Sequence, residues 1–160
     1  MIEMSLAGVR LELPTNSPIV LLREASGERY LPIWIGQNEA AAIAIALQGV
    51  VTPRPMTHDL LKNVITDLDG VVERIVVCDL RENTFYARIH IRSQQKALTV
   101  DARPSDAIAL ALRTEAKIFV EESVITGAQG VEASKESMDV GRLRKWLEGL
   151  SDEQLGKYKM

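Results

Sequence analysis

The stretch Asp101-Ala-Arg-Pro-Ser-Asp-Ala-Ile-Ala-Leu-Ala-Leu-Arg113 decides how the rest of the chain is arranged. It begins with charged and polar residues and then runs apolar without interruption over residues 107–112. Pro104 suits the first position of a helix, and Asp106 would then lie in the first turn, where the helix dipole favours a carboxylate. Because no polar face appears before Arg113, we expect a helix that is packed on several sides. A buried helix with a polar N-terminus suits either a structural lock or an anion site.

The composition is that of an ordinary globular protein. The chain has 160 residues, of which 46% are hydrophobic and 26% are charged, which is enough for one domain with a substantial core. A net charge of −3 argues against a protein that coats nucleic acid through bulk electrostatics, so any nucleic-acid contact would come from a local basic patch. The single cysteine, Cys78, excludes an intramolecular disulfide and a thiolate zinc cluster, and we expect it to be a small core residue.

Nothing in the sequence predicts a membrane segment. The longest unbroken apolar run, residues 40–47, is too short to span a bilayer, and the first residues do not show the basic and apolar regions of a signal peptide. We therefore expect a cytoplasmic protein without a membrane partner.

An internal repeat relates the two apolar helices. Ile43-Ala-Ile-Ala-Leu47 matches Ile108-Ala-Leu-Ala-Leu112 at an offset of 65 residues, and the same offset relates Ile33 to Leu98. The match is short and made of common residues, so chance similarity is the alternative explanation. The agreement of strand, polar turn and helix in the same order favours duplication. We therefore predict an α+β domain of internally duplicated units, each with antiparallel strands and a buried helix.

Hydrophobic alternation predicts the other elements. Strands are expected at 4–13, 19–23, 30–35, 71–80, 84–92, 97–100 and 117–120, and residues 121 to about 131 are expected to be irregular. Thr57 is predicted to cap an amphipathic helix, which ends where Gly70 takes a left-handed conformation. The apolar stripe of this helix is Leu60, Leu61, Val64, Ile65 and Leu68.

The domain is expected to cover residues 1–130, followed by a helical appendage over 131–160. The appendage carries a narrow apolar stripe, which suits docking on the main body. This stripe consists of Leu143, Trp146, Leu147 and Leu150.

The second polar cluster is Arg54-Pro-Met-Thr-His-Asp59. His58 and Asp59 are adjacent, so on a helix they point about 100° apart and cannot form a facing dyad alone. In one interpretation, Asp59 binds a divalent cation, or His58 acts near a scissile phosphate held by Arg54. In the other, Asp59 only stabilises the first turn and His58 lies on the surface. For each residue taken alone the second interpretation is preferred. The similar polar group of Asp101, Arg103 and Asp106 strengthens the first, because oxygen ligands from several elements suit Mg²⁺ or Mn²⁺.

The predicted strand 84–92 has two different faces. Tyr86, Arg88, His90 and Arg92 alternate with apolar residues. The polar face could hold a nucleic-acid backbone, with Tyr86 as a stacking platform. A solvated sheet face of mixed charge explains the same alternation equally well.

Several kinds of active site are absent from the sequence. It contains no Gly-rich phosphate loop, no Gly-x-Ser-x-Gly elbow, no His-Glu-x-x-His and no spaced Cys/His set. Ser105 has no evident base beside it in the sequence, which favours a role at the helix entry over a nucleophile.

The same motifs resemble a known family. The segments Leu31-Pro-Ile-Trp-Ile-Gly36, Arg54-Pro55 with Thr57-His58-Asp59-Leu60, and Asp101–Leu110 occur in the order found in the bifunctional nuclease family, a bacterial and plant group. The resemblance implies cleavage of DNA and RNA, a duplicated fold and a homodimer. The motif positions in this chain are Glu39, Arg54, His58, Asp59, Asp101, Arg103, Ser105 and Asp106.

Two hypotheses follow. In the first, the protein is a nuclease that hydrolyses phosphodiester bonds with a divalent metal. Its candidate catalytic residues are His58, Asp59, Asp101 and Asp106. Its candidate substrate-binding residues are Arg54, Arg103, Tyr86, Arg88 and Arg92, and its candidate metal ligands are Asp59, Asp101 and Glu39. In the second, the protein is a non-catalytic dimeric binding or regulatory module, whose arginines pair with buried carboxylates to lock the fold.

Overall fold

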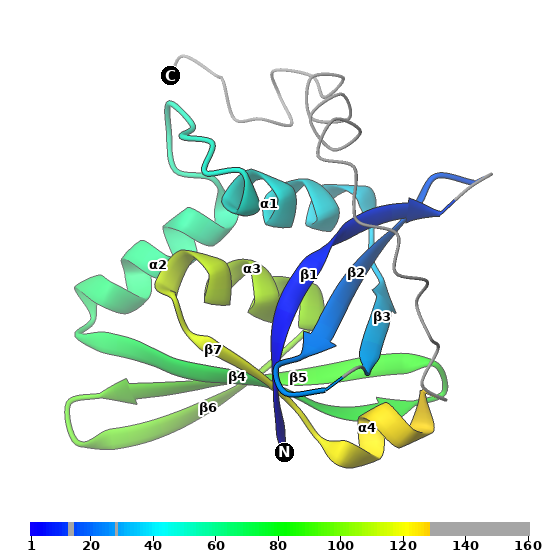
Figure 1. Ribbon diagram of the computed structural model, residues 1–160. Coiled ribbons are helices and arrows are strands. Elements are labelled where there is room, and N and C mark those ends of the chain that lie inside the picture. Colours follow the sequence, from blue (N-terminus) through cyan, green and yellow to red (C-terminus); the bar gives the residue numbers. More distant parts are fainter. Residues whose placement is uncertain (13–14, 28, 129–160) are drawn as a thin grey trace.

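A mixed seven-stranded sheet forms the described part of the chain, with three of the helices on one face and the short last helix on the other side (Figure 1). The computed structural model describes residues 1–12, 15–27 and 29–128, so the predicted appendage over 131–160 lies outside the described residues. The strands are β1 (Ile2–Glu12), β2 (Ser17–Glu24), β3 (Tyr30–Trp34), β4 (Gly70–Arg81), β5 (Thr84–Ser93), β6 (Lys96–Ala102) and β7 (Lys117–Val120). The helices are α1 (Gln37–Leu47), α2 (Thr57–Asp67), α3 (Pro104–Thr114) and α4 (Glu122–Gly127).

The strand order β3-β2-β1-β7-β4-β5-β6 is symmetrical about β7. On one side, β1, β2 and β3 pair antiparallel and lead into α1, and on the other, β4, β5 and β6 pair antiparallel and lead into α3. The central strand β7 joins the halves, antiparallel to β1 and parallel to β4. The predicted α+β fold with two strand-and-helix units is therefore confirmed.

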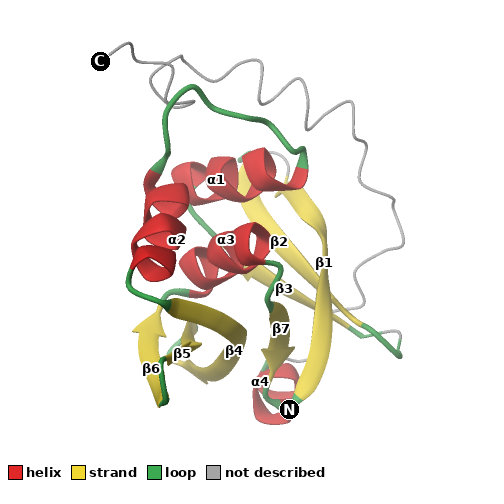
Figure 2. Cartoon of the chain, turned by 90° about the vertical axis from the view of Figure 1, so that its left-hand side faces the viewer, coloured by secondary structure: helices red, strands yellow, loops and turns green. Residues whose placement is uncertain are grey.

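The two apolar helices lie side by side on the sheet, with α2 packed against α3 (Figure 2). Residues 107–111 of α3 are all 0–1% exposed, as the uninterrupted apolar run predicts. Pro104 occupies the first turn and Asp106 lies beside it. Fully burying an Ile or Leu contributes roughly 1.5–3 kcal/mol, so this helix is a main source of the stability of the core.

Both ends of α2 differ from the prediction. The capping residue is Met56 rather than Thr57, and its N–H donates to the Asp59 carboxylate at 3.0 Å. At the other end, Asp69 takes the left-handed conformation with φ 60°, whereas Gly70 already starts β4. Gly70 is needed there for space, because a Cβ would lie 2.9 Å from the Ile65 carbonyl oxygen.

The predicted irregular segment after residue 120 is partly wrong, since Glu122–Gly127 forms α4. Val124 and Ile125 of this helix are buried in the core, and α4 packs against β4. A helix of six residues is too short to show an apolar periodicity in the sequence, which explains the error.

The apolar stripe of α2 lies mostly in solvent. None of its residues is fully buried, and Leu60, Val64 and Leu68 are exposed. The edge strand β6 is also exposed along its length, including Leu98 and Val100. We name Leu60, Val64 and Leu68 the α2 stripe.

None of the helices in the described residues combines the length and the hydropathy that a membrane span requires.

Candidate functional site

The N-terminal ends of α1, α2 and α3 meet at one cavity of about 460 Å³. Each helix contributes a polar side chain to its wall. These are Glu39 from α1, His58 from α2, and Arg103 and Asp106 from the start of α3. We name these four residues the helix-end cluster. Its position follows from the fold, because α1 and α2 both pack against α3.

The cluster is held together by hydrogen bonds. His58 Nε2 lies 2.9 Å from Asp106 Oδ1, and Arg103 Nε donates to Asp106 Oδ2 at 2.8 Å. A second Arg103 nitrogen, Nη1, donates to Glu39 Oε1 at 3.0 Å. The two polar motifs of the sequence, 54–59 and 101–106, therefore meet through His58 and Asp106.

The electrostatics of the cluster favour a charged Asp106 carboxylate. Burial alone would raise the pKa of Asp106, but the hydrogen bonds from Arg103 and His58 offset it and hold that pKa below its usual value. The same hydrogen bond with Asp106, together with that to Glu39, raises the pKa of Arg103. The positive end of the α3 dipole also favours the charged form of Asp106, because Asp106 is the third residue of that helix.

Asp59 has different partners from its neighbour His58. Its carboxylate accepts a hydrogen bond from Arg113 Nε at 2.6 Å as well as the bond from Met56. Arg113 also donates to the carbonyls of Ala109 at 2.8 Å and Ala42 at 3.1 Å, so it ties the three helices together. The Arg113 side chain is only 7% exposed. Asp59 is therefore a structural partner of a buried arginine, outside the helix-end cluster.

Arg113 has no predicted role in the sequence motifs. The signal for it was the lone charge that ends the apolar run of α3. A charged residue on a helix with no other polar face must find a buried partner, and here that partner is 54 residues away.

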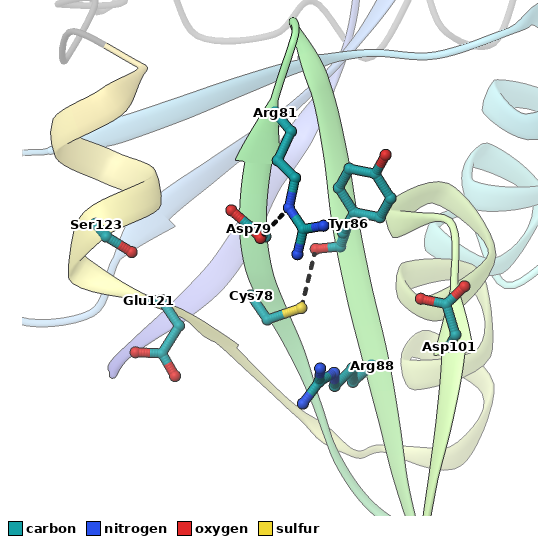
Figure 3. Close-up of a pocket in the computed structure, with 8 residues that line it drawn as sticks. All are labelled: Cys78, Asp79, Arg81, Tyr86, Arg88, Asp101, Glu121 and Ser123. Atoms are coloured by element: carbon teal, nitrogen blue, oxygen red, sulfur yellow. Dashed lines mark hydrogen bonds and ion pairs between the residues drawn. The ribbon is translucent and has the colours of Figure 1, made fainter.

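Asp101, Tyr86 and Arg88 lie on the face of the sheet opposite α1, α2 and α3, beside the short helix α4 (Figure 3). Ala87 and Ile89 point into the core, so their neighbours on β5 must point outward. Asp101 on β6 pairs in register with Arg88. We name this cavity of about 370 Å³ the outer-face pocket; it is also lined by Cys78, Asp79, Arg81, Glu121 and Ser123.

The outer-face pocket corrects the expectation for Cys78. Its thiol is only half-buried, and it lies 3.6 Å from the Tyr86 carbonyl oxygen instead of in the core. Burial nevertheless raises the pKa of this thiol. Arg81 pairs with Asp79 at 2.5 Å and lies 5.1 Å from the centre of the Tyr86 ring.

Comparison with known proteins places the chain in a family. The model of the bifunctional nuclease domain matches residues 20–133. The chain belongs to the bifunctional nuclease domain family. An uncharacterized protein of Mycobacterium tuberculosis is 50% identical over 126 residues, which is 79% of this chain and 75% of that protein.

Two plant members of the bifunctional nuclease family are more distant. Bifunctional nuclease 1 of Oryza sativa subsp. japonica is 25% identical over 120 residues, which is 71% of this chain and 36% of the rice protein. Bifunctional nuclease 2 of the same plant is 26% identical over 137 residues, which is 81% of this chain and 42% of that protein. This bifunctional nuclease domain thus spans less than half of either rice protein.

The bifunctional nuclease domain separates the three candidate metal ligands. Glu39 binds Arg103, Asp59 binds Arg113, and Asp101 lies in the outer-face pocket. Within residues 1–12, 15–27 and 29–128, no group of three or more His, Cys, Asp or Glu side chains is arranged to hold a metal ion. The residues present therefore do not fit a metal held by these three carboxylates.

Two candidate substrate-binding residues lie outside the cavities described above. Arg92 pairs with Glu73 on the neighbouring strand at 3.3 Å. Arg54 lies exposed in the segment before α2, where its carbonyl accepts a hydrogen bond from Thr52. Of the predicted arginines, only Arg103 is part of the helix-end cluster.

Proposed function

We propose that the helix-end cluster hydrolyses phosphodiester bonds in nucleic acid. The observation that carries this proposal is the 2.9 Å contact between His58 and Asp106 beside an arginine that is 63% exposed. An imidazole oriented by a carboxylate is a common general base, and an arginine is well suited to binding a phosphate. The membership in the bifunctional nuclease domain family supports the same chemistry.

The hydrogen bonds suggest how the proton would move. When His58 Nε2–H donates to Asp106, the lone pair is on Nδ1, which can take a proton from the attacking water. The hydroxide formed attacks the phosphorus, the bond to the leaving oxygen breaks, and the protonated His58 returns its proton to that oxygen. Asp106 holds the ring in the orientation and tautomer that this step needs.

Arg103 would bind the phosphate. Its guanidinium has five N–H groups, and the contacts with Asp106 and Glu39 use three of them. The two others, with the positive ends of the helix dipoles, favour an anion in the cavity. We assign Arg54 a weaker role, in which its exposed charge attracts the nucleic-acid backbone.

Tyr86, Arg88 and Arg92 remain proposed contacts for the rest of the nucleic acid. Tyr86 and Arg88 line the outer-face pocket, and a ring beside two arginines suits a base and its phosphate. Because this pocket opens on the other face of the sheet, it would bind a flanking part of the strand and take no part in the hydrolysis.

Dependence on a divalent metal stays a prediction. The described carboxylates do not converge on one ion, so none of the steps above passes through a metal. A chelator added to the cleavage assay tests the prediction directly.

The test uses the two histidines of the chain as a matched pair. Tag-free protein is incubated with single-stranded DNA and RNA, with and without chelator, and initial rates are compared for His58→Ala and His90→Ala. His58→Ala should lower the rate about 10²–10⁴-fold, as expected for loss of a general base, whereas His90→Ala should cleave like the parent. Equal rates in all three proteins would assign the activity to a contaminant.

The alternative is a non-catalytic dimeric binding protein. The observations that favour it are the arginine pairing of Asp59 and Asp106 and the exposed apolar surface on α2 and β6. A second copy could pair along the open edge of β6 and cover Leu98. The mass in solution tests this: Leu98→Glu should convert a dimer into a monomer, whereas Val51→Glu, at a residue equally apolar but 93% exposed, should not.

A further inference from the structure

We propose that a cavity beside the helix-end cluster binds one mononucleotide unit, with its base on Trp34 and its phosphate on Ser105 and the N-terminus of α3. We name this cavity the tryptophan pocket; its volume is about 360 Å³, within the range of small-molecule sites. The inference rests on the proposed function for its substrate class, and it adds a site for the nucleotide next to the bond that is cleaved.

The tryptophan pocket shares a wall with the helix-end cluster. Glu39 and Arg103 line both cavities. A ligand in the tryptophan pocket would therefore lie on one side of Arg103, with His58 on the other. This is the arrangement needed to hold a nucleotide beside a scissile phosphate.

Ser105 is the residue that points to a ligand. It is the second residue of α3, it is only 6% exposed, and it lines the pocket. Within the described residues its hydroxyl has no hydrogen-bond partner, although buried polar groups usually have one. Among the described residues, Arg74 Nε is the only side-chain nitrogen or oxygen that has neither a hydrogen-bond partner nor contact with solvent. The Ser105 hydroxyl therefore keeps some contact with solvent, and Ser105 lines the pocket.

The backbone around Ser105 adds donors for an anion. The first residue of α3 is a proline, and the capping residue Arg103 makes no side-chain hydrogen bond to the helix backbone. The N–H groups of the first turn are therefore not capped by a side chain, and the helix dipole places partial positive charge there. A phosphate is the anion that best matches a hydroxyl, backbone N–H groups and a neighbouring guanidinium.

Trp34 supplies the apolar part of the site. It is the last residue of β3, and although it is a large aromatic residue it is 56% exposed. Its Nε1–H donates to Glu12 Oε2 at 2.9 Å, which fixes the orientation of the ring. Phe85 lines the same pocket. A fixed exposed indole stacks well on any nucleobase, so this end of the site should accept all four bases.

The test measures binding by calorimetry, with no cleavage involved. Adenosine 5′-monophosphate, ribose 5-phosphate and adenosine are titrated into the full chain and into Trp34→Ala, Trp34→Phe and Ser105→Ala. Trp34→Ala should weaken the monophosphate about tenfold, within the range known for base stacking, and leave ribose 5-phosphate unchanged. Trp34→Phe should restore most of the affinity, and Ser105→Ala should weaken both phosphates but not adenosine.

The controls separate this inference from the proposed function. Tyr30→Ala, at the other end of β3, should bind like the parent. His58→Ala should bind the monophosphate normally even though it cleaves far more slowly than the parent. A chain that cleaves nucleic acid but does not bind the monophosphate would overturn the inference alone. Binding that is insensitive to both Trp34→Ala and Ser105→Ala would overturn it as well.

Discussion

The two halves of the sheet contain the same elements but end differently. In the first half, the edge strand β3 buries Ile33 at 2% exposure, whereas the corresponding strand of the second half, β6, leaves Leu98 45% exposed. The second half also has α2 packed against it, and the α2 stripe is exposed. Three of the four residues of the helix-end cluster come from α2 and α3, and only Glu39 comes from the first half.

This difference supports the location of the proposed site. The parts that the halves share are the antiparallel strands and the apolar helices, which build the core. The parts in which they differ are a polar helix entry and an exposed apolar surface, and both belong to the second half. Departures from packing rules are expected at functional sites. The core therefore depends mainly on what the two halves share, and the proposed site lies where they differ.

The largest expected effect tests the edge strands. Ile33→Ala should lower the free energy of unfolding by about 3 kcal/mol, because it leaves a cavity in the core. Leu98→Ala, at the related position, should cost less than about 1 kcal/mol, because its side chain is half exposed already. Denaturant unfolding at low protein concentration measures both. Similar losses would show that β6 is as well covered as β3.

The next effect concerns the ion pair between Asp59 of α2 and Arg113 of α3. Asp59→Ala leaves the buried guanidinium of Arg113 without its carboxylate and should cost about 2–3 kcal/mol. The value is below that of a fully buried pair, because Asp59 is partly exposed and Arg113 keeps two carbonyl acceptors. Arg29→Ala, which removes the surface ion pairs with Glu24 and Glu122, is the matched control and should cost much less.

The same pair predicts a response to acid. Burial raises the pKa of Asp59, but the Met56 N–H and Arg113 outweigh it, so the pKa in the folded protein lies below the unfolded value. The stability contributed by this group is therefore fully present above about pH 4 and is lost as the pH falls through the lower, folded pKa. Asp59→Asn should flatten this part of the stability curve. A parent and variant with parallel curves below pH 4 would contradict the assignment.

The smallest expected effect compares the ends of α1 and α3. Both helices end in a left-handed residue, with φ 62° at Gly49 and φ 56° at Glu115. Glycine adopts this conformation without strain and glutamate does not, so Glu115→Gly should raise the free energy of unfolding by about 0.5–1 kcal/mol. Gly49→Ala should lower it, and an added Cβ there meets no atom within 4 Å, so the change reports backbone strain alone. A destabilised Glu115→Gly would show that its side chain is needed.

The sequence predicts those parts of the fold that depend on local patterns. The apolar run 107–112 with Pro104 before it was sufficient to predict a buried helix, and alternation located all seven described strands to within a few residues. The α4 helix was not predictable in this way, because six residues give no periodicity. The exposure of the α2 stripe was not predictable either, since the sequence pattern of an apolar stripe is the same whether the stripe is buried or exposed.

The site was less predictable because it depends on long-range geometry. Asp101 and Asp106 are five residues apart, and the sequence suggested one cluster. Asp101, however, still belongs to β6, where strand alternation turns its side chain to the face opposite the helices. The pairing of Asp59 with Arg113 was hidden in the same way, because it joins two helices that are far apart in the chain.

The most direct test of the proposed site is a double-mutant cycle on the cleavage rate. Single-turnover rates on single-stranded RNA are measured for His58→Ala, Asp106→Asn and the double variant, each shown to be folded at the assay temperature. If Asp106 acts by orienting His58, the double variant should be no slower than His58→Ala, because residues that act as one unit are not additive. Two independent losses that multiply, or rates equal to that of the parent, would contradict the account.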